Sequence, residues 1–203
     1  MNILKPKFWD KNQISFFAIS LFPIAILIQL LNLIKNLFVK KINFSIPVIC
    51  VGNIYLGGTG KTPFCIELQS ILKRLNKNPA FIRKKYKAYE DEINSLKKVG
   101  LVYESDKRSI ALKDAIKNNV NVAILDDGFQ DFSIQKDLTL ICFNEAQWIG
   151  NGLTIPSGPL RENLSALKRA NFVIVNGKRN TDIEEKILKN NKLIKIFYTK
   201  HVP

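Results

Sequence analysis

VICVGNIYLGGTGKT, residues 48–62, is the stretch that decides the fold of this chain. The apolar run at 48–51 predicts a buried strand, a glycine-rich turn follows it, and an amphipathic helix is expected from about Thr62 to Leu75. A strand that leads through such a turn into Gly-Lys-Thr and a helix is typical of a phosphate-binding loop, or P-loop. Glycines let backbone amides converge on phosphate oxygens, and the helix N-terminus adds partial positive charge.

The end of the loop carries the groups that act on a nucleoside triphosphate. Lys61 is expected to neutralise the β- and γ-phosphates of ATP, and the Thr62 hydroxyl is expected to ligate Mg²⁺. Tyrosine stands where the strict motif has its first glycine, so the loop is a variant. Leu56 stands where certain dimer-activated ATPases carry a lysine, which argues against that group. The residues predicted to bind ATP are Tyr55, Leu56, Gly57, Gly58, Thr59, Gly60, Lys61 and Thr62.

Asp126 and Asp127 are candidates for the carboxylates that a P-loop needs to position magnesium. They follow the apolar run at 122–125, and an apolar run that ends in acid is the Walker-B pattern. Adjacent side chains point to opposite sides of an extended backbone, so one aspartate can face the metal while the other orients the loop or a water molecule. The predicted metal ligands are therefore Thr62, Asp126 and Asp127.

The other apolar runs predict a mostly parallel sheet. Helix-sized spacers separate these runs, which lie at 80–83, 100–103, 122–125, 138–143 and 172–175. Strands that alternate with helices are typical of α/β proteins in which helices cover a parallel sheet. We expect an α/β, P-loop NTPase-like domain over 46–203 and a hydrophobic, membrane-associated helix within 1–45.

Composition excludes several other classes of protein. The 203 residues are 46% hydrophobic and 24% charged, which is a globular composition rather than one of long disorder. Cys50, Cys65 and Cys142 lie in apolar runs without CxxC spacing, so we expect them to be buried. His201 is the only histidine, which argues against a histidine-based metal site and against a Ser-His-Asp triad.

The chain is strongly basic, with 31 Lys and Arg against 17 Asp and Glu, a formal net charge of +14. Only the run at 83–87 is densely basic, and no nucleic-acid-binding motif accompanies it, so nucleic acid is not an expected partner. An anionic membrane surface and a phosphorylated substrate are better partners for this charge.

The 21 residues from Ile14 to Ile34 carry no charge and are long enough to span a bilayer core. A secretory signal peptide is not expected, because no small-residue cleavage site follows. Pro23, Gln29 and Asn32 weaken a clean span, and lysines lie on both sides, so the sequence favours a helix lying in the membrane interface. The alternatives are a transmembrane helix and a helix packed on the protein's own core or on a partner.

Four motifs, together with the hydrophobic N-terminal segment, resemble those of the tetraacyldisaccharide 4′-kinases, the lipid A 4′-kinases of Gram-negative bacteria. They occur in the family's order and cover most of the chain: GNIYLGGTGKTP at 52–63, LDDGFQ at 125–130, GNGLTIPSGPLRE at 150–162 and VIVNG at 173–177. The resemblance implies transfer of the ATP γ-phosphate to the 4′-hydroxyl of a tetraacylated glucosamine disaccharide 1-phosphate, a step of lipopolysaccharide synthesis. It also implies anchoring by the N-terminal helix at the cytoplasmic face of the inner membrane, with no obligate protein partner.

The resemblance further implies roles for residues outside the P-loop. Asp91, within Glu-Asp-Glu at 90–92, matches the family's carboxylate that accepts the hydroxyl proton, so the expected catalytic set is Lys61, Asp91 and Asp127. An acidic turn ahead of a helix at 93–98 is the alternative for this stretch. Arg161 is expected to bind a phosphate bidentately, the alternative being a Gly-Pro turn with a surface ion pair. The expected substrate-binding residues are Glu92, Gln130, Arg161 and Glu162.

The chain departs from the family pattern at several places. RKKYKA at 83–88 replaces a glycine-rich element, and Asp131 stands where the family often has histidine. Family members continue well past the position of Pro203, so a C-terminal truncation is expected. Two other functions stay open at this point: a membrane-tethered P-loop ATPase or switch, and a nucleotide-binding pseudoenzyme.

Overall fold

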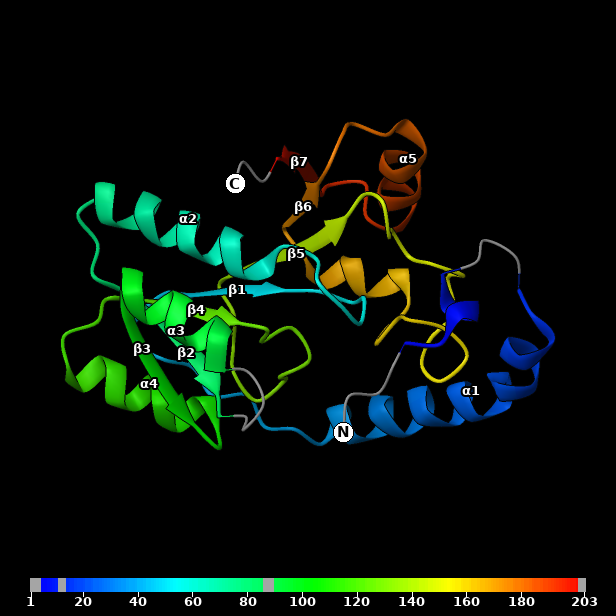
Figure 1. Ribbon diagram of the computed structural model, residues 1–203. Coiled ribbons are helices and arrows are strands. Elements are labelled where there is room, and N and C mark those ends of the chain that lie inside the picture. Colours follow the sequence, from blue (N-terminus) through cyan, green and yellow to red (C-terminus); the bar gives the residue numbers. More distant parts are fainter. Residues whose placement is uncertain (1–4, 11–13, 86–89, 201–203) are drawn as a thin grey trace. The chain divides into compact units, whose positions relative to one another are not determined.

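A computed structural model of the chain describes residues 5–10, 14–85 and 90–200 (Figure 1). His201 and the end of the basic run at 83–87 lie outside these residues. The chain forms two compact units. The first unit comprises Lys40–Asn53 and Gly60–Cys142, and the second comprises Met1–Val39, Ile54–Thr59 and Phe143–Val202. The division at 45/46 expected from the sequence stays a prediction.

Parallel strands form the sheet of the first unit, in the order β3-β2-β4-β1-β5. Their bounds are β1 Val48–Gly52, β2 Pro79–Lys84, β3 Leu101–Ser105, β4 Val122–Asp126 and β5 Leu138–Asn144, the last of which continues into the second unit. The register places Cys50 of β1 beside Leu125 of β4 and beside Thr139 of β5. All residues of β1 and β4 are buried, as expected of strands covered on both faces. The sheet predicted from the apolar runs is confirmed.

Three helices connect these strands: α2 (Lys61–Arg74), α3 (Glu90–Val99) and α4 (Arg108–Lys117). Crossovers between parallel strands are right-handed, and the chain reverses its direction across the sheet after β3. Therefore α2 and α3, which contact each other, lie on one face, and α4 lies on the opposite face (Figure 1). This topology brings the carboxyl ends of β1 and β4 together, because the two strands are neighbours in the sheet.

The three cysteines are core residues of the first unit. Cys50, Cys65 and Cys142 are all buried and unbridged, as expected from the sequence. Burial raises the pKa of the Cys50 and Cys142 thiols to about 12, so both stay protonated at neutral pH. Their role in the described structure is that of small core residues.

The second unit contains a second parallel pair of strands, β6 (Phe172–Asn176) and β7 (Lys195–Thr199), joined by α5 (Thr181–Asn190). Asn180 caps α5 by accepting bonds from the amides of Asp182 and Ile183. The same unit contains the short helices η1 (Lys7–Trp9) and η2 (Leu164–Arg169) and the N-terminal helix α1 (Phe16–Leu37).

Helix α1 exposes most of its apolar surface. Ser15 caps its N-terminus, and only Ala18 and Ala25 of its residues are buried. By length and composition alone the helix is able to cross a bilayer. Its large apolar side chains project outward, with Phe16 79% and Leu31 57% exposed. A helix that belonged to the protein's own core would bury these side chains, so the structure does not support that alternative for α1.

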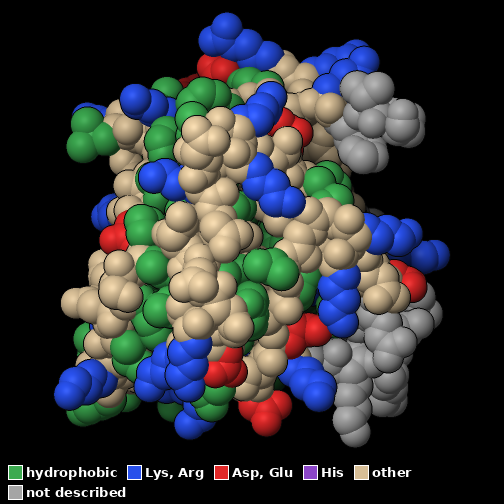
Figure 2. Space-filling model, turned by 90° about the vertical axis from the view of Figure 1, so that its left-hand side faces the viewer, with side chains coloured by type: hydrophobic (Ala, Val, Ile, Leu, Met, Phe, Trp, Pro, Cys, Tyr) green, Lys and Arg blue, Asp and Glu red, His purple; other side chains and the backbone are tan. Residues whose placement is uncertain are grey.

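Basic side chains are distributed over the surface. Figure 2 shows Lys and Arg side chains spread over the visible face, with Asp and Glu among them. On this face the distribution agrees with the scattered lysines of the sequence.

Candidate active site

The P-loop begins where β1 ends and leads directly into α2. Gly57 has φ +147° and Gly60 has φ +82°, and both values lie where L side chains are strained. Gly60 is the N-cap of α2, and Lys61 and Thr62 form its first turn. The strand, glycine turn and helix predicted from 48–62 are therefore confirmed.

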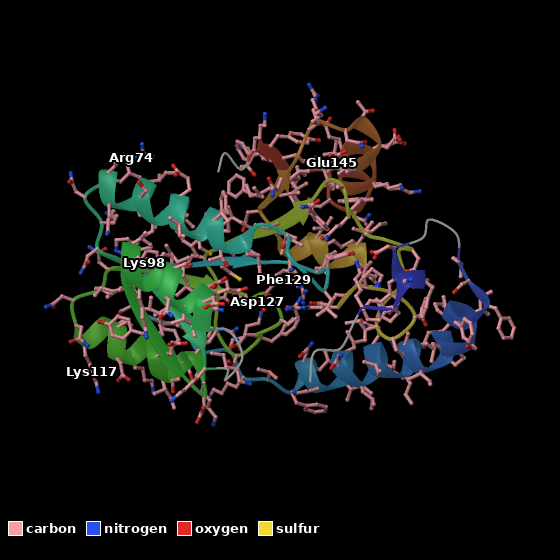
Figure 3. All side chains as sticks on the ribbon, in the orientation of Figure 1. Arg74, Lys98, Lys117, Asp127, Phe129 and Glu145 are labelled. Carbon is pink, nitrogen blue, oxygen red and sulfur yellow. The ribbon has the colours of Figure 1, made fainter. Side chains whose placement is uncertain are left out.

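Lys61 and Asp127 meet in the first unit. The Lys61 Nζ lies 3.7 Å from Asp127 Oδ1, and the two side chains are 15% and 27% exposed. Asp127 follows β4 directly, and its amide donates to the Val51 carbonyl of β1 at 2.9 Å. The P-loop lysine and the aspartate that follows β4 are thus neighbours, and both side chains are partly exposed. Asp127 is labelled in Figure 3.

The two aspartates occupy different environments, but not for the reason expected from the sequence. Asp127 has φ +56°, so its backbone is left-handed and not extended. Asp126 is the last residue of β4 and is 2% exposed. The Asp126 Oδ2 lies 3.3 Å from Arg83 Nη1, and Oδ1 accepts a weak bond from the Cys65 thiol at 3.8 Å. Asp126 therefore faces inward, whereas Asp127 is the more exposed of the pair.

Burial and neighbouring charges shift the pKa of Asp126. Desolvation raises the pKa of this carboxyl above its usual value, the positive charge of Arg83 lowers it, and the charge of Asp127 raises it further. The Arg83 guanidinium has a raised pKa, because Asp126 and Glu92 outweigh the effect of its burial. The Arg83 guanidinium thus holds the Asp126 side chain in place next to Asp127.

Arg83 is a site residue that sequence reasoning missed. It comes from the end of β2, its side chain is 7% exposed, and besides Asp126 it bonds Glu92 Oε2 at 3.0 Å. Arg83 thus connects Glu92 of α3 to Asp126 at the end of β4. The available signal is the position of Arg83 at the end of the apolar run at 80–83, which predicts a buried strand, although its charge also places it in the dense basic run at 83–87.

A second group of cations holds the turn after Asp127, and it was also missed. Arg108, 7% exposed at the start of α4, donates to the Asp127 carbonyl at 2.7 Å and pairs with Asp131 Oδ2 at 3.3 Å. Lys136 donates to the carbonyls of Phe129 and Asp131 at 3.0 and 2.7 Å. Asp131, expected only as a departure from the family pattern, is thus part of the support for this turn.

The turn after β4 also approaches β1 closely. A Cβ added at Gly52 would lie 2.5 Å from the Cβ of Phe129, so only glycine fits there. Gln130 donates from Nε2 to the Asn53 carbonyl at 3.0 Å, which ties the turn to the start of the P-loop. Its expected contact with substrate stays a prediction.

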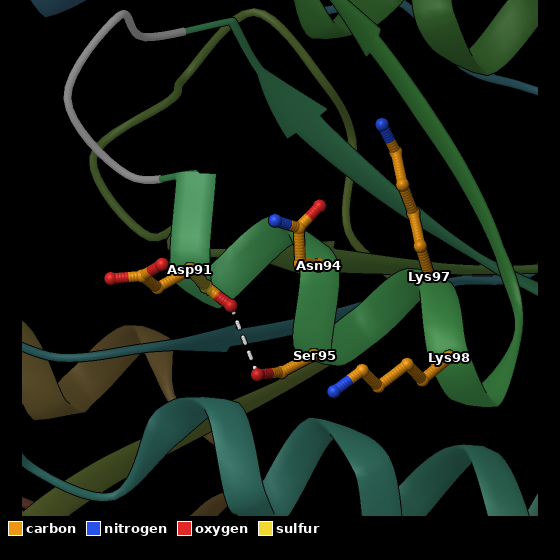
Figure 4. A pocket seen from close by; sticks show the side chains of 5 residues that line it. All are labelled: Asp91, Asn94, Ser95, Lys97 and Lys98. Atoms are coloured by element: carbon orange, nitrogen blue, oxygen red, sulfur yellow. Dashed lines mark hydrogen bonds between the residues drawn. The ribbon is translucent and has the colours of Figure 1, made fainter.

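Asp91 lies in the first turn of α3, beside a shallow hollow of about 620 Å³ (Figure 4). The side chain is exposed, and its backbone carbonyl accepts from the Ser95 hydroxyl at 2.9 Å. Lys98 runs toward Ser95 in Figure 4, while Lys97 projects to another side of the helix. The alternative of an acidic turn ahead of a helix at 93–98 is wrong in its bounds, because α3 begins at Glu90. The role of Asp91 as a base stays a prediction.

In the second unit, the first half of the P-loop pairs with the signature stretch at 150–162. The Leu56 amide donates to the Pro159 carbonyl at 2.8 Å, and the Arg161 amide donates to the Ile54 carbonyl at 2.7 Å. Tyr55 and Leu160 form an antiparallel bridge between these bonds. The Leu56 amide therefore already has a hydrogen-bond acceptor in the Pro159 carbonyl.

Glu162 pairs with Arg169 at 2.6 Å. Arg161 and Glu162 belong to this second unit, whereas Lys61 and Asp127 belong to the first. The expected contacts of Arg161 and Glu162 with substrate stay predictions.

The donor set of the first unit fits Mg²⁺. A threonine hydroxyl at the start of α2 and carboxylate oxygens after β4 are the hard ligands that this ion prefers. The Asp126 Oδ2 is buried without a hydrogen-bond donor among the described residues, its neighbour being the Arg83 cation. Asp127 is the better ligand, because it is the more exposed carboxylate and lies beside the P-loop lysine.

The chain matches a family model over nearly its whole length. The model is described as tetraacyldisaccharide-1-P 4'-kinase and matches residues 17–99 and 96–203. A tetraacyldisaccharide 4'-kinase of Pelagibacter ubique (strain HTCC1062) is 45% identical over an alignment of 205 residues, which covers 100% of this chain and 65% of the relative. One from Rickettsia bellii (strain OSU 85-389) is 32% identical, covering 96% of this chain and 65% of the relative. The chain thus spans 65% of the length of these two relatives.

A solved structure shares the fold. It is the "apo" form of LpxK from Aquifex aeolicus in complex with ATP, which is 20% identical with a TM-score of 0.69 and covers 91% of this chain and 82% of that one. This likeness confirms the α/β, P-loop NTPase-like fold expected from the sequence. With the family model and the curated relatives, it leads to one conclusion: the chain belongs to the tetraacyldisaccharide-1-P 4'-kinase family.

Proposed function

We propose that this chain carries the nucleotide site of a membrane-associated lipid kinase that transfers the γ-phosphate of ATP to the 4′-hydroxyl of a tetraacylated glucosamine disaccharide 1-phosphate. The observation that carries the proposal is the ion pair between Lys61, in the first turn of the helix that follows the P-loop, and Asp127. Membership of the family and the ATP complex of the Aquifex aeolicus relative support the same reaction.

In the proposed reaction the sugar 4′-oxygen attacks the γ-phosphorus, and the bond from that phosphorus to the β,γ-bridging oxygen breaks to release ADP. The hydroxyl proton passes to a carboxylate base, for which Asp91 is our candidate. Lys61 and the amides at the N-terminus of α2 would hold the negative charge that spreads over the phosphate oxygens.

Mg²⁺, when bound by Thr62 and Asp127, supplies charge neutralisation at the β- and γ-phosphates. We assign Asp126 and its partner Arg83 to holding the carboxyl end of β4 in place beneath Asp127. Arg108 fixes the Asp127 backbone from the other side, through the carbonyl bond at 2.7 Å. These residues orient the metal ligand and do not themselves react.

We further propose that α1 holds the kinase at the lipid surface where its acceptor lies, at the cytoplasmic face of the inner membrane. A substrate with four acyl chains does not leave the bilayer, so the enzyme must approach it. The outward apolar side chains of α1 favour burial in a lipid surface. The net charge of +14 favours a surface that is anionic. An interfacial helix satisfies these observations without requiring a span.

The test is transfer of ³²P from [γ-³²P]ATP to the tetraacyldisaccharide 1-phosphate in mixed micelles, followed by thin-layer separation. Label on the disaccharide is the expected result. Label found only as free phosphate would instead indicate an ATPase, and nucleotide binding without any turnover would indicate a pseudoenzyme. Either of these results would overturn the kinase assignment for this chain.

Asp91→Asn tests the assignment of the base, with Asp106→Asn as the matched control. Asp106 is an exposed aspartate between β3 and α4, and its substitution removes the same charge. Loss of transfer in the first variant with retained ATP binding is expected, because a base acts in the chemical step. Equal rates in the two variants would exclude Asp91.

A further inference from the structure

The tyrosine that breaks the P-loop consensus is fully buried in the second unit and connects to the N-terminal segment. The Tyr55 hydroxyl accepts a hydrogen bond from Lys5 Nζ and donates one to Asp10 Oδ1 at 3.1 Å. Lys5 and Asp10 also form an ion pair with each other. The hydroxyl of a P-loop residue thus contacts two residues that lie 45 and 50 positions away in the sequence.

The ring of Tyr55 reaches the loop itself. A Cβ added at Gly57 would lie 3.3 Å from Tyr55 Cε1 and 3.6 Å from Cδ1, so the ring is the surface against which Gly57 rests. Gly57 holds φ +147°, a conformation that must be kept if its amide is to point at a phosphate. Displacement of the ring would release the residue that starts the glycine turn.

The N-terminal segment that supplies Lys5 and Asp10 is itself fixed. Trp9, buried in η1, donates from Nε1 to the Pro156 carbonyl at 3.1 Å, and its own carbonyl accepts from the Asn151 amide at 2.8 Å. The same stretch at 150–162 pairs with Tyr55 through Leu160. Both the backbone and the side chain of Tyr55 are therefore held by one continuous set of contacts within the second unit.

We propose that Lys5, Asp10 and Tyr55 are positioning residues of the nucleotide site, which fix the first half of the P-loop through the Tyr55 ring. This inference rests on the proposed function, because it requires that the loop bind ATP. The three residues touch no reacting atom; they act through Gly57. The protonated hydroxyl suits this role, since burial raises the pKa of Tyr55 and keeps its proton available to Asp10.

The test is the affinity of the full chain in detergent micelles for Mg·ATP, measured by calorimetry. Tyr55→Phe keeps the ring and removes the hydroxyl, and Lys5→Met removes one partner while leaving a partly exposed position that tolerates change. Each variant is expected to bind Mg·ATP about tenfold more weakly, the effect of one lost charge-assisted hydrogen bond. Lys5→Arg, which restores a donor, is expected to recover most of the affinity.

Lys7→Met is the matched control, because Lys7 is an exposed lysine of η1 and its loss removes the same charge from the same segment. It is expected to bind within about twofold of the wild type. The double variant Lys5→Met/Tyr55→Phe is expected to lose no more affinity than the weaker-binding single variant, because the two residues form one cluster.

The outcomes separate the two proposals. A wild-type chain without affinity for Mg·ATP would refute the proposed function. A wild-type chain that binds, with Tyr55→Phe and Lys5→Met binding equally well, would refute the positioning role. So would additive losses in the double variant, or losses that merely follow a lower midpoint of urea unfolding.

Discussion

Arg83 and Arg108 show how single buried cations organise this site. The side chains of Arg83 and Arg108 are each 7% exposed. Each guanidinium connects a carboxylate to a second element of the first unit. A buried charge is costly unless it is paired, so the loss of one partner leaves the other uncompensated. The consequences are testable residue by residue.

Arg83→Met is expected to lower the free energy of unfolding by about 3–5 kcal/mol, because Asp126 would be left buried without its cation. Urea unfolding measures this change. Arg74→Met is the matched control: its ion pair with Glu67 is 68% and 64% exposed, and we expect a change below about 0.5 kcal/mol. The double variant Arg83→Met/Asp126→Asn is expected to regain part of the loss, and a double variant as unstable as the sum of its singles would contradict this pairing.

Asp131→Asn tests the support of the turn after Asp127 through its pH dependence. Burial alone would raise the pKa of Asp131, but hydrogen bonds from Ser133 and the charge of Arg108 outweigh it and bring the pKa below the ordinary 3.8. A lowered pKa in the folded state means that stability from the carboxylate is present above the unfolded pKa and is lost as pH falls through the folded one.

At pH 7 the Asp131→Asn variant is therefore expected to be less stable than the wild type by about 1–2 kcal/mol. The difference should begin to shrink as the pH falls below the ordinary pKa of 3.8, and it should be lost as the pH falls through the lowered pKa of the folded carboxylate. Urea unfolding at a series of pH values measures both free energies. A difference that stays constant from pH 7 to pH 3 would show that the charge of Asp131 does not contribute.

At the level of elements, the strands and the P-loop could be predicted because their signals are local. Each buried strand is a short apolar run, and the glycine turn lies between one such run and a helix. Strand β7 was not predicted, because its apolar run at 196–198 is only three residues long; in the structure none of its residues is fully buried.

The supports of the site could not be predicted, because each joins residues distant in sequence. Arg83 meets Asp126, and Tyr55 meets Lys5, only once the sheet and the 150–162 stretch have formed. The left-handed backbone of Asp127 was equally hidden, since an Asp-Asp-Gly sequence does not fix which residue takes positive φ. Motif spacing thus predicted the strand, P-loop and helix, but not the contacts that hold them.

Gly52→Ala tests the close approach of β1 and the turn after β4. The added methyl would meet Phe129 Cβ at 2.5 Å, and we expect a loss of about 1–3 kcal/mol in the free energy of unfolding. Gly58→Ala is the control from the same loop, because its Cβ would meet nothing within 4 Å, and its cost should stay below about 1 kcal/mol. Equal losses in the two variants would mean that the contact does not limit stability.

At the scale of the whole molecule, the proposed contact of α1 with the membrane can be tested on α1 itself. Leu27→Glu/Leu31→Glu places two charges on exposed positions of α1. Co-sedimentation with anionic vesicles is expected to fall at least about tenfold, because charged side chains are costly in the apolar interface. Leu193→Glu, at a 91% exposed leucine outside α1, is the control and should sediment like the wild type. Equal loss in the control would mean that net charge, and not α1, governs membrane binding.

Calorimetric titration of the full chain and of its Lys61→Ala variant with Mg·ATP is the most direct test of whether the P-loop binds ATP. We expect saturable binding by the wild type, competition by ADP, and an affinity at least about tenfold lower in the variant, because the lysine would be the principal cation at the phosphates. Equal binding by the two proteins, or no binding by the folded wild type, would contradict this expectation.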